Sequence, residues 1–224
     1  EHETAPMYGY FDPVSFPKLP KGELVMHGKG TIVQSIDATI KGEEAAPLVE
    51  RKYQHYYSHF QAPVGEKTGN PVVTVNDQTM YYTFPLFEMY KTQGVKAYKE
   101  LILAGIDHLL NSKKMITSDL PTSADVILNH QESQKRLILN LLHYIPERRA
   151  LSLDTIEDKI PLYDQQIELD LCVIRNKTNL DNLIIKQVDQ VKSNQTLPFE
   201  IVEDKVIFTV PKIDGYEVIT MNYE

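Results

Sequence analysis

The densest group of side chains that could carry chemistry lies at residues 53–60, Tyr-Gln-His-Tyr-Tyr-Ser-His-Phe. His55 and His59 are four residues apart, a spacing that would place both on one face of a helix, and such pairs can bind a metal. The segment lacks the glutamate of a hydrolytic zinc helix, no third ligand is identifiable, and Pro63 follows within one turn. We therefore predict no metal site and expect an ordered loop or an interface, where aromatic rings and imidazoles often pack.

The other residue types that carry catalysis give no site either. Cys172, the only cysteine, follows alternating apolar residues and is predicted to be a small core residue of a strand rather than a thiolate. Gly28 and Gly30 follow a predicted strand, but no GxGxxG pattern completes a phosphate-binding loop. His130 and His143 lie in predicted strands, where we expect hydrogen-bonded structural histidines. Paired carboxylates for glycoside hydrolysis cannot be chosen by spacing, because the working pair meets in space from distant strands. The residues alone predict no catalytic residue and no cofactor.

Composition and charge exclude several classes of protein. The 224 residues are 42% hydrophobic, enough for one large or two modest globular domains. The formal net charge is −8 without a long basic run, so we expect no nucleic-acid partner. No stretch reaches the roughly 18 apolar residues of a membrane helix, and the start of the chain lacks a signal-peptide pattern. We expect a soluble protein with no membrane partner, and the sequence does not decide between cytoplasm and periplasm. Because the chain starts at Glu1 rather than at a methionine, we also expect it to be part of a longer protein.

Structural elements in the first half of the chain must position the 53–60 segment. Prolines are frequent over the first 71 residues, which argues against long helices there. The pattern predicts a strand, a glycine turn and a strand at 23–36, and a hairpin or two successive strands at 71–84. A short helix at 87–93 should end at Gly94, and a 3.6-residue period predicts a long amphipathic helix at 95–110.

The second half of the chain changes to short β-rich runs separated by turns, and no helix is predicted after residue 114. This pattern is typical of an antiparallel β-sandwich of about 105 residues. We predict an α/β domain at 1–116 and a β-sandwich domain at 117–224. The predicted strands contain residues 126–128, 136–144, 165–173, 183–188, 199–202, 205–210 and 216–221.

Several segments together resemble the C-terminal half of the family 42 β-galactosidase-type glycoside hydrolases and of the related family 151 α-fucosidase-like proteins. The C-terminal part follows the rhythm of the small β domain of these families, and the first half resembles the end of their trimerisation domain and a "His, Ser-His, Gln, Pro" stretch of the family 151-like members. The residues that carry the resemblance are Leu120-Pro121, Val126-Ile127-Leu128, Gln131, Arg136-Leu137, Leu141-Leu142-His143-Tyr144, Val206 to Pro211 and Asp214 to Val218, with Thr83 to Phe87, Tyr90, Gly94, Tyr98, His55, Ser58, His59, Gln61 and Pro63 in the first half.

The resemblance implies a partial flavodoxin-like or class I glutamine amidotransferase-like domain, followed by the β-sandwich. It also implies a homo-oligomer, a trimer in these families, and a carbohydrate substrate in the parent enzyme. The catalytic barrel of these families has no counterpart here, so no catalytic residue is carried over.

We therefore expect the non-catalytic C-terminal portion of a glycoside hydrolase, which supports oligomerisation and the stability of the barrel. On this reading Tyr53, His55, Tyr57, His59 and Phe60 are interface or substrate-rim residues, and the loop projects toward the active site of its own or a neighbouring subunit. The alternative is a carbohydrate-binding β-sandwich module, although the chain has no tryptophan.

Overall fold

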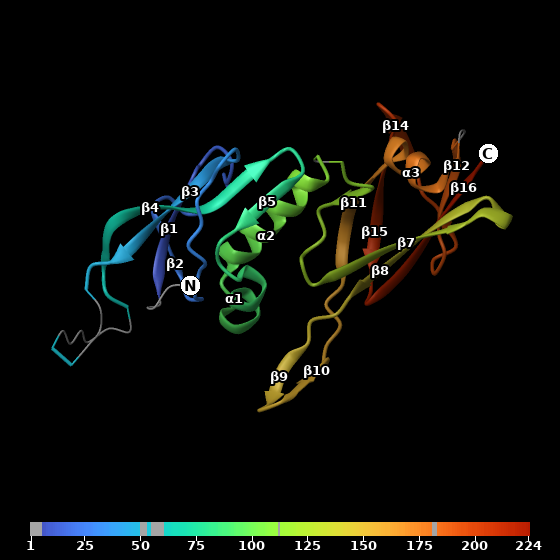
Figure 1. Ribbon diagram of the computed structural model, residues 1–224. Helices are drawn as coiled ribbons and strands as arrows, with labels where there is room; N and C mark the ends of the chain where they lie inside the picture. Colours follow the sequence, from blue (N-terminus) through green and yellow to red (C-terminus); the bar gives the residue numbers. More distant parts are fainter. Residues whose placement is uncertain (1–5, 50–52, 55–60, 112, 181–182) are drawn as a thin grey trace. The chain divides into compact units, whose positions relative to one another are not determined.

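The computed structural model describes residues 6–49, 53–54, 61–111, 113–180 and 183–224 (Figure 1). Contacts divide the chain into two compact units, Glu1–Ser112 and Lys113–Glu224, and each is described by itself. Both units are built mainly from antiparallel sheets, with three short α-helices in the described residues. In the same residues, no helix combines the length and the apolar character needed to cross a membrane.

The N-terminal unit contains one five-stranded antiparallel sheet with the strand order β2-β1-β3-β4-β5. β4 is the longest strand, and a two-residue connection at Asp77 and Gln78 joins it to β5, with Val73 opposite Tyr82 and Asn76 opposite Thr79. Of the two arrangements predicted at 71–84, the structure shows the hairpin. The strands are β1 (Met7–Phe11), β2 (Glu23–Met26), β3 (Thr39–Pro47), β4 (Val64–Asn76) and β5 (Thr79–Tyr82).

Two helices follow the sheet directly, α1 (Leu86–Gln93) and α2 (Lys96–Leu109). Gly94 ends α1 in the left-handed conformation, with φ of 64°, and its N–H donates to the carbonyl of Tyr90, as predicted from the sequence. The buried side chains of both helices pack with those of the sheet into one core. Its fully or nearly fully buried members are Met7, Phe16, Met26, Val72, Val73, Phe84, Leu86, Met89, Tyr98 and Leu101.

The flavodoxin-like arrangement expected for the N-terminal unit is not what the structure shows. Every strand pairing among its described residues is antiparallel, whereas a flavodoxin-like sheet is parallel and needs long crossover connections. The short β4–β5 connection permits only an antiparallel pair, and both helices come after the last strand rather than between strands. The strand predicted at Thr31 to Val33 is also wrong, because that segment has no regular secondary structure.

The C-terminal unit is a sandwich of a four-stranded sheet, β14-β15-β11-β6, and a five-stranded sheet, β13-β12-β16-β8-β7. The predicted strands after residue 120 are present, with shifted ends. Their bounds are β6 (Ile116–Ser118), β7 (Ala124–Gln131), β8 (Arg136–His143), β11 (Leu162–Asp170), β12 (Ile185–Gln190), β13 (Gln195–Thr196), β14 (Phe199–Val202), β15 (Lys205–Ile213) and β16 (Tyr216–Tyr223), with a 3₁₀ turn, η1 (Glu132–Gln134), between β7 and β8.

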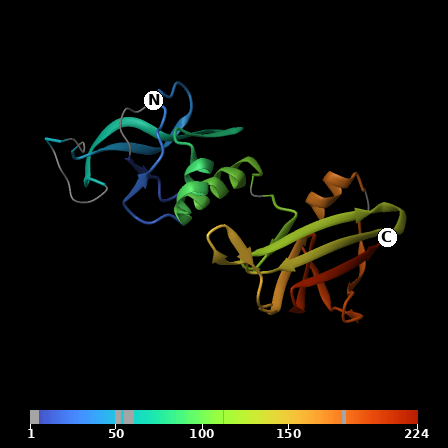
Figure 2. The same ribbon diagram turned by 90° about the horizontal axis from the view of Figure 1, so that it is seen from below.

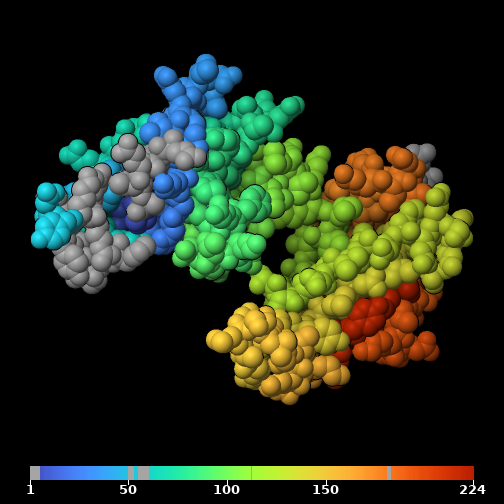
Figure 3. Space-filling view, turned by 60° about the horizontal axis from the view of Figure 1, so that its bottom comes forward, coloured from blue at the N-terminus to red at the C-terminus, as the bar shows by residue number. Residues whose placement is uncertain are grey.

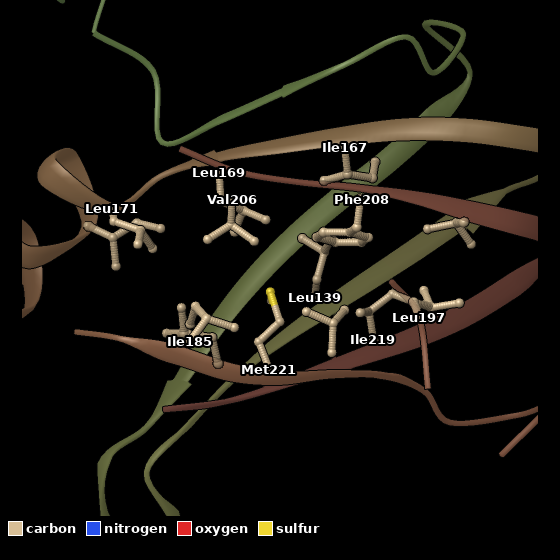
Figure 4. Packing of buried hydrophobic residues seen from close by; sticks show 14 of the residues in the cluster. Leu139, Ile167, Leu169, Leu171, Ile185, Leu197, Val206, Phe208, Ile219 and Met221 are labelled. Carbon is tan, nitrogen blue, oxygen red and sulfur yellow. The ribbon is translucent and has the colours of Figure 1, made fainter. Parts of the chain in front are cut away.

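Alternation of buried and exposed positions along these strands produces the core between the two sheets. β8 buries every second residue, Leu137, Leu139 and Leu141, and leaves the residues between them partly exposed. Figure 4 shows Ile167 and Phe208 of one sheet pointing toward side chains of the other sheet. The shared apolar layer makes this unit one cooperative body.

Residues 171–178 correct the prediction that no helix follows residue 114. They form α3 (Leu171–Thr178), and the Asp170 carboxylate accepts a hydrogen bond from the Val173 N–H at 2.9 Å, an N-cap that starts the helix. Leu171 and Ile174 are buried on one side of the helix. Cys172 is therefore an exposed helical residue and not a core residue of a strand.

A separate two-stranded hairpin, β9 (Glu147–Ala150) and β10 (Leu153–Thr155), belongs to the C-terminal unit but to neither of its sheets. It extends away from both sheets in two views (Figures 1 and 2). Side-chain hydrogen bonds from Arg148 to Asp154 cross the hairpin. The hairpin carries the apolar side chains of Leu151 and Leu153 in exposed positions.

Candidate functional site

A polar cleft of about 620 Å³ lies in the N-terminal unit, at the start of α1. One wall is the segment after β2, with His27, Lys29 and Thr31, and the other comprises the end of β5 and the exposed side of α1, with Glu88 and Gln93. A hydrogen bond from the Thr31 N–H to the Thr83 carbonyl, at 2.8 Å, joins the two walls. The cleft therefore presents an imidazole, an ammonium, a carboxylate, an amide and hydroxyls, a set suited to binding a polar ligand.

Tyr98, a fully buried residue of α2, holds the His27 segment in place. Its hydroxyl donates to the Val25 carbonyl at 2.6 Å and accepts from the His27 N–H at 3.3 Å. Burial raises the pKa of Tyr98, so the phenol stays protonated and keeps donating at physiological pH. The backbone at the end of β2 is thereby fixed to the long helix.

Close packing at Gly28 fixes the same segment against α1. A Cβ atom at this position would lie 2.9 Å from both Met89 Sδ and Pro85 Cγ. Only glycine permits the backbone to approach the helix this closely. The sequence reading took Gly28 as part of a turn, and the structure gives it this packing role.

The 53–60 segment lies within the connection between β3 and β4, and the base of this connection is closed by several bonds. The Leu48 N–H donates to the Pro63 carbonyl at 2.8 Å, and the Tyr8 hydroxyl donates to the Ala62 carbonyl. The Gln61 amide nitrogen lies 3.3 Å from both ring nitrogens of His27 and donates to whichever is unprotonated. The residue that directly follows the aromatic segment is thus tied to the cleft.

Of the predicted interface or substrate-rim residues, the structure describes only Tyr53, whose side chain is fully exposed. His55, Tyr57, His59 and Phe60 lie outside the described residues. His27 was not singled out from the sequence as a site residue, because a lone histidine beside two glycines looks like part of a turn. The Gln61 contact that identifies it joins residues 34 positions apart and leaves no local sequence signal.

The carboxylates of the cleft can be compared with those that glycoside hydrolysis uses. Glu88 is the only carboxylate among its described lining residues, whereas glycoside hydrolysis uses a pair of carboxyl groups. Tyr82 also lines the cleft, and burial raises the pKa of its phenol, which donates to the Leu101 carbonyl at 2.5 Å. Across the described part of the chain, no three His, Cys, Asp or Glu residues gather as a metal site would require.

The histidines of the C-terminal unit are structural, as predicted. The two ring nitrogens of His143 lie 3.0 Å from the Ile160 carbonyl oxygen and 3.1 Å from Ser123 Oγ. His130 Nε2 lies 2.7 Å from the Tyr223 hydroxyl. Both imidazoles connect elements of the sandwich through these contacts.

Comparison with known proteins assigns this architecture to a class. No protein-family model matches the chain, and no curated protein sequence matches it. Among solved structures, a glycoside hydrolase is similar over the whole chain, so the fold is glycoside hydrolase-related. This structure is alpha-L-fucosidase isoenzyme 2 from Paenibacillus thiaminolyticus, with a TM-score of 0.89 and 26% sequence identity. The match covers 100% of this chain and 32% of the fucosidase chain, so the chain spans about a third of its neighbour's length.

Proposed function

We propose that this chain is the non-catalytic C-terminal portion of a longer glycoside hydrolase, α-fucosidase-like rather than β-galactosidase-like, and that it supports oligomerisation and the stability of a catalytic barrel. The observation that carries the proposal is the match of the entire chain to one third of an alpha-L-fucosidase. The α-fucosidase-like choice follows from that neighbour. The amidotransferase-like ancestry expected for the first domain is not part of the proposal, because the sheet there is antiparallel.

The polar cleft supplies the part of this function that concerns substrate. We infer that the cleft and the 53–60 segment line the rim of a carbohydrate site that the catalytic portion completes. Sugar hydroxyls both donate and accept hydrogen bonds. Matching donors and acceptors are present in the His27 imidazole, the Gln61 amide and the Thr31 hydroxyl. Binding residues often lie in the connections between the elements of a rigid scaffold.

The test of the overall proposal uses the 224-residue chain and a longer protein that contains it. We expect the chain alone to hydrolyse neither nitrophenyl α-L-fucoside nor nitrophenyl β-galactoside, and the longer protein to hydrolyse the fucoside. Deleting the 224 residues from the longer protein should reduce its oligomer mass and its thermal stability. Hydrolysis by the chain alone, or unchanged mass and stability after the deletion, would contradict the proposal.

The rim role has its own variants in the longer protein. His27→Ala and Gln61→Ala should raise KM for the fucoside, and the His55→Ala/His59→Ala pair should change KM or the oligomer size. His108→Ala is the matched control, because His108 belongs to the same unit but does not line the cleft. Its Nε2 contacts the Asn76 carbonyl instead. Unchanged kinetics and unchanged oligomer size in all of the test variants would remove the rim role and leave the scaffold role standing.

The alternative of a carbohydrate-binding sandwich makes a different prediction. Tyr163 and Tyr216 are exposed aromatic residues of the sandwich strands, the ring type that stacks on sugars. The Lys212 ammonium lies 6.0 Å from the Tyr163 ring centre, and the Tyr216 hydroxyl donates to Asn140 Oδ1. Binding of the isolated chain to a glycan array that is lost in the Tyr163→Ala/Tyr216→Ala variant would favour the module.

A further inference from the structure

An apolar groove of about 500 Å³ runs between β5 and the two helices of the N-terminal unit. It adjoins the polar cleft but extends along α2 to Leu109, and the lining residues that the two share are Tyr81, Tyr82, Phe84, Pro85 and Glu88. Glu88 is the single charged residue among its described lining residues. Both helices lie at the surface of the unit, in green in the space-filling view (Figure 3).

The helix α2 carries more apolar surface than its own sheet can cover. Tyr98, Leu101 and Gly105 are buried, which is the single stripe that a helix needs for packing on one side. A second stripe, Ile102, Ile106 and Leu109, follows the same helical spacing and lines the groove. Ile106 is 44% exposed and Leu109 is 59% exposed.

The rim of the groove adds aromatic side chains from α1 and β5. Phe87 is 75% exposed and Tyr81 is 48% exposed, and both line the groove. Tyr90 and Leu110 continue the exposed apolar surface one helical turn beyond Phe87 and Ile106. The exposed parts of these five side chains and of Leu109 together come to roughly 500 Å², taking about 200 Å² for a whole aromatic side chain and about 100 Å² for an aliphatic one.

This area decides what kind of partner fits. A standard stable interface buries about 800 Å² on each partner, so the apolar surface accounts for most of one side of such an interface. The area lies toward the upper end of the roughly 300–600 Å² that the largest apolar patch of a typical monomer covers, and such patches are often functional. The surface also holds both halves of a contact, an exposed phenylalanine at Phe87 and the groove itself, which Ile102, Ile106 and Leu109 line.

We propose that this groove binds a second copy of the chain, with Phe87 of one copy entering the groove of the other. Because Phe87 and the groove lie on one patch, the patch is complementary to itself, which is what a two-fold symmetric contact between identical subunits requires. An aromatic anchor in an apolar pocket is the usual centre of interface binding energy. The inference rests on the proposed oligomerisation role and assigns that role to named residues.

The test is sedimentation equilibrium of the full 224-residue chain over a range of concentrations. The wild type should self-associate, and Phe87→Asp should raise the dissociation constant by at least about 30-fold, as expected for a central anchor. Leu109→Asp is a second variant, which places the charge on α2 rather than on α1. Ile36→Asp is the matched control, because Ile36 is almost completely exposed and does not line the groove. Circular dichroism and urea midpoints confirm that each variant is folded.

Each outcome decides the matter. If Phe87→Asp and Leu109→Asp associate as tightly as the wild type and Ile36→Asp, the groove is not the contact between copies. The proposed oligomerisation role of the chain is then not contradicted. A wild type that stays monomeric at every concentration also overturns the groove, and the deletion experiment on the longer protein then judges the scaffold role separately. Loss of association in both groove variants and retention in Ile36→Asp supports the proposal.

Discussion

Replacement of Tyr98 by phenylalanine should separate the hydrogen-bonding role of this residue from its packing role. The ring is fully buried in the core of the N-terminal unit, and phenylalanine fills nearly the same volume. The variant loses only the hydroxyl, which bonds to the Val25 carbonyl at 2.6 Å and to the His27 N–H at 3.3 Å. The structure of the core should therefore survive, while the end of β2 loses its attachment to α2.

The expected magnitude follows from the partners left behind. Leaving buried hydrogen-bonding groups without a partner costs about 1–3 kcal/mol, so we expect the free energy of unfolding of the N-terminal unit to fall by about 2 kcal/mol. For a unit of this size, that corresponds to a decrease in Tm of roughly 8 °C. Tyr98→Ala removes the ring as well and should cost about 3–5 kcal/mol, the range for deletion of a large aromatic core residue.

Hydrogen exchange measured by mass spectrometry is the appropriate assay, because it reports on each unit separately. Exchange in peptides of β2 and of α2 should accelerate in Tyr98→Phe, and exchange in the sandwich should not change. Tyr90→Phe is the control, since Tyr90 is a partly exposed tyrosine of the neighbouring helix. If Tyr98→Phe changes the stability of the N-terminal unit by less than about 0.5 kcal/mol, as expected of a plain surface substitution, the argument that this hydroxyl positions His27 is refuted.

Three further predictions concern the described residues. Burial raises the pKa of Tyr82 and Tyr98 above the ordinary value of 10.0. The stability that the two phenols contribute is therefore complete below about pH 10, where the phenols of the unfolded chain begin to ionise, and is lost as the pH rises further. An ultraviolet titration in which every tyrosine of the native protein ionises near pH 10 would contradict this. Cys172 is exposed and should react with a thiol reagent without denaturant; a requirement for urea would place it in the core after all. Gly28→Ala should destabilise the protein by about 1–3 kcal/mol in urea unfolding through overpacking against Met89, and an unchanged midpoint would mean that α1 moves aside freely.

The elements that the sequence predicts correctly are those whose local signals agree with their packing. The helical period of α2 agrees with the stripe of residues that it buries. Gly94 ends α1, and the turn at Asp77 and Gln78 joins two β-rich runs, so in both places a turn residue agrees with the elements beside it. The sandwich strands carry strict alternation, as in β8, where every second residue is buried. For these segments the tertiary structure adds nothing that opposes the local preference.

The errors occur where two signals compete or where the decisive contact is distant in sequence. The apolar alternation of β11 continues in the sequence through Leu171, yet Asp170 caps a helix that begins there. Apolar residues at every second position predict a strand, and this pattern hides the capping signal of Asp170. The two-residue connection between β4 and β5 permits only an antiparallel pair, and the strand propensities of single residues do not distinguish parallel from antiparallel pairing. The Gln61–His27 contact that ties the aromatic segment to the cleft depends on packing, so it could not be found by spacing.

The closed base of the connection between β3 and β4 has a consequence for how this scaffold can change over evolutionary time. The connection begins after β3 and ends before β4, and a 2.8 Å hydrogen bond between Leu48 and Pro63 joins its two ends. The pairing of β3 with β4 therefore offsets the entropy lost when these ends are brought together. Doubling the length of a loop whose ends are held costs only about 0.6 kcal/mol more. Insertions between the two anchor points that leave the Gln61 and Ala62 contacts in place should therefore cost little folding free energy. The length of this connection can then change over evolutionary time without disturbing the pairing of β3 with β4.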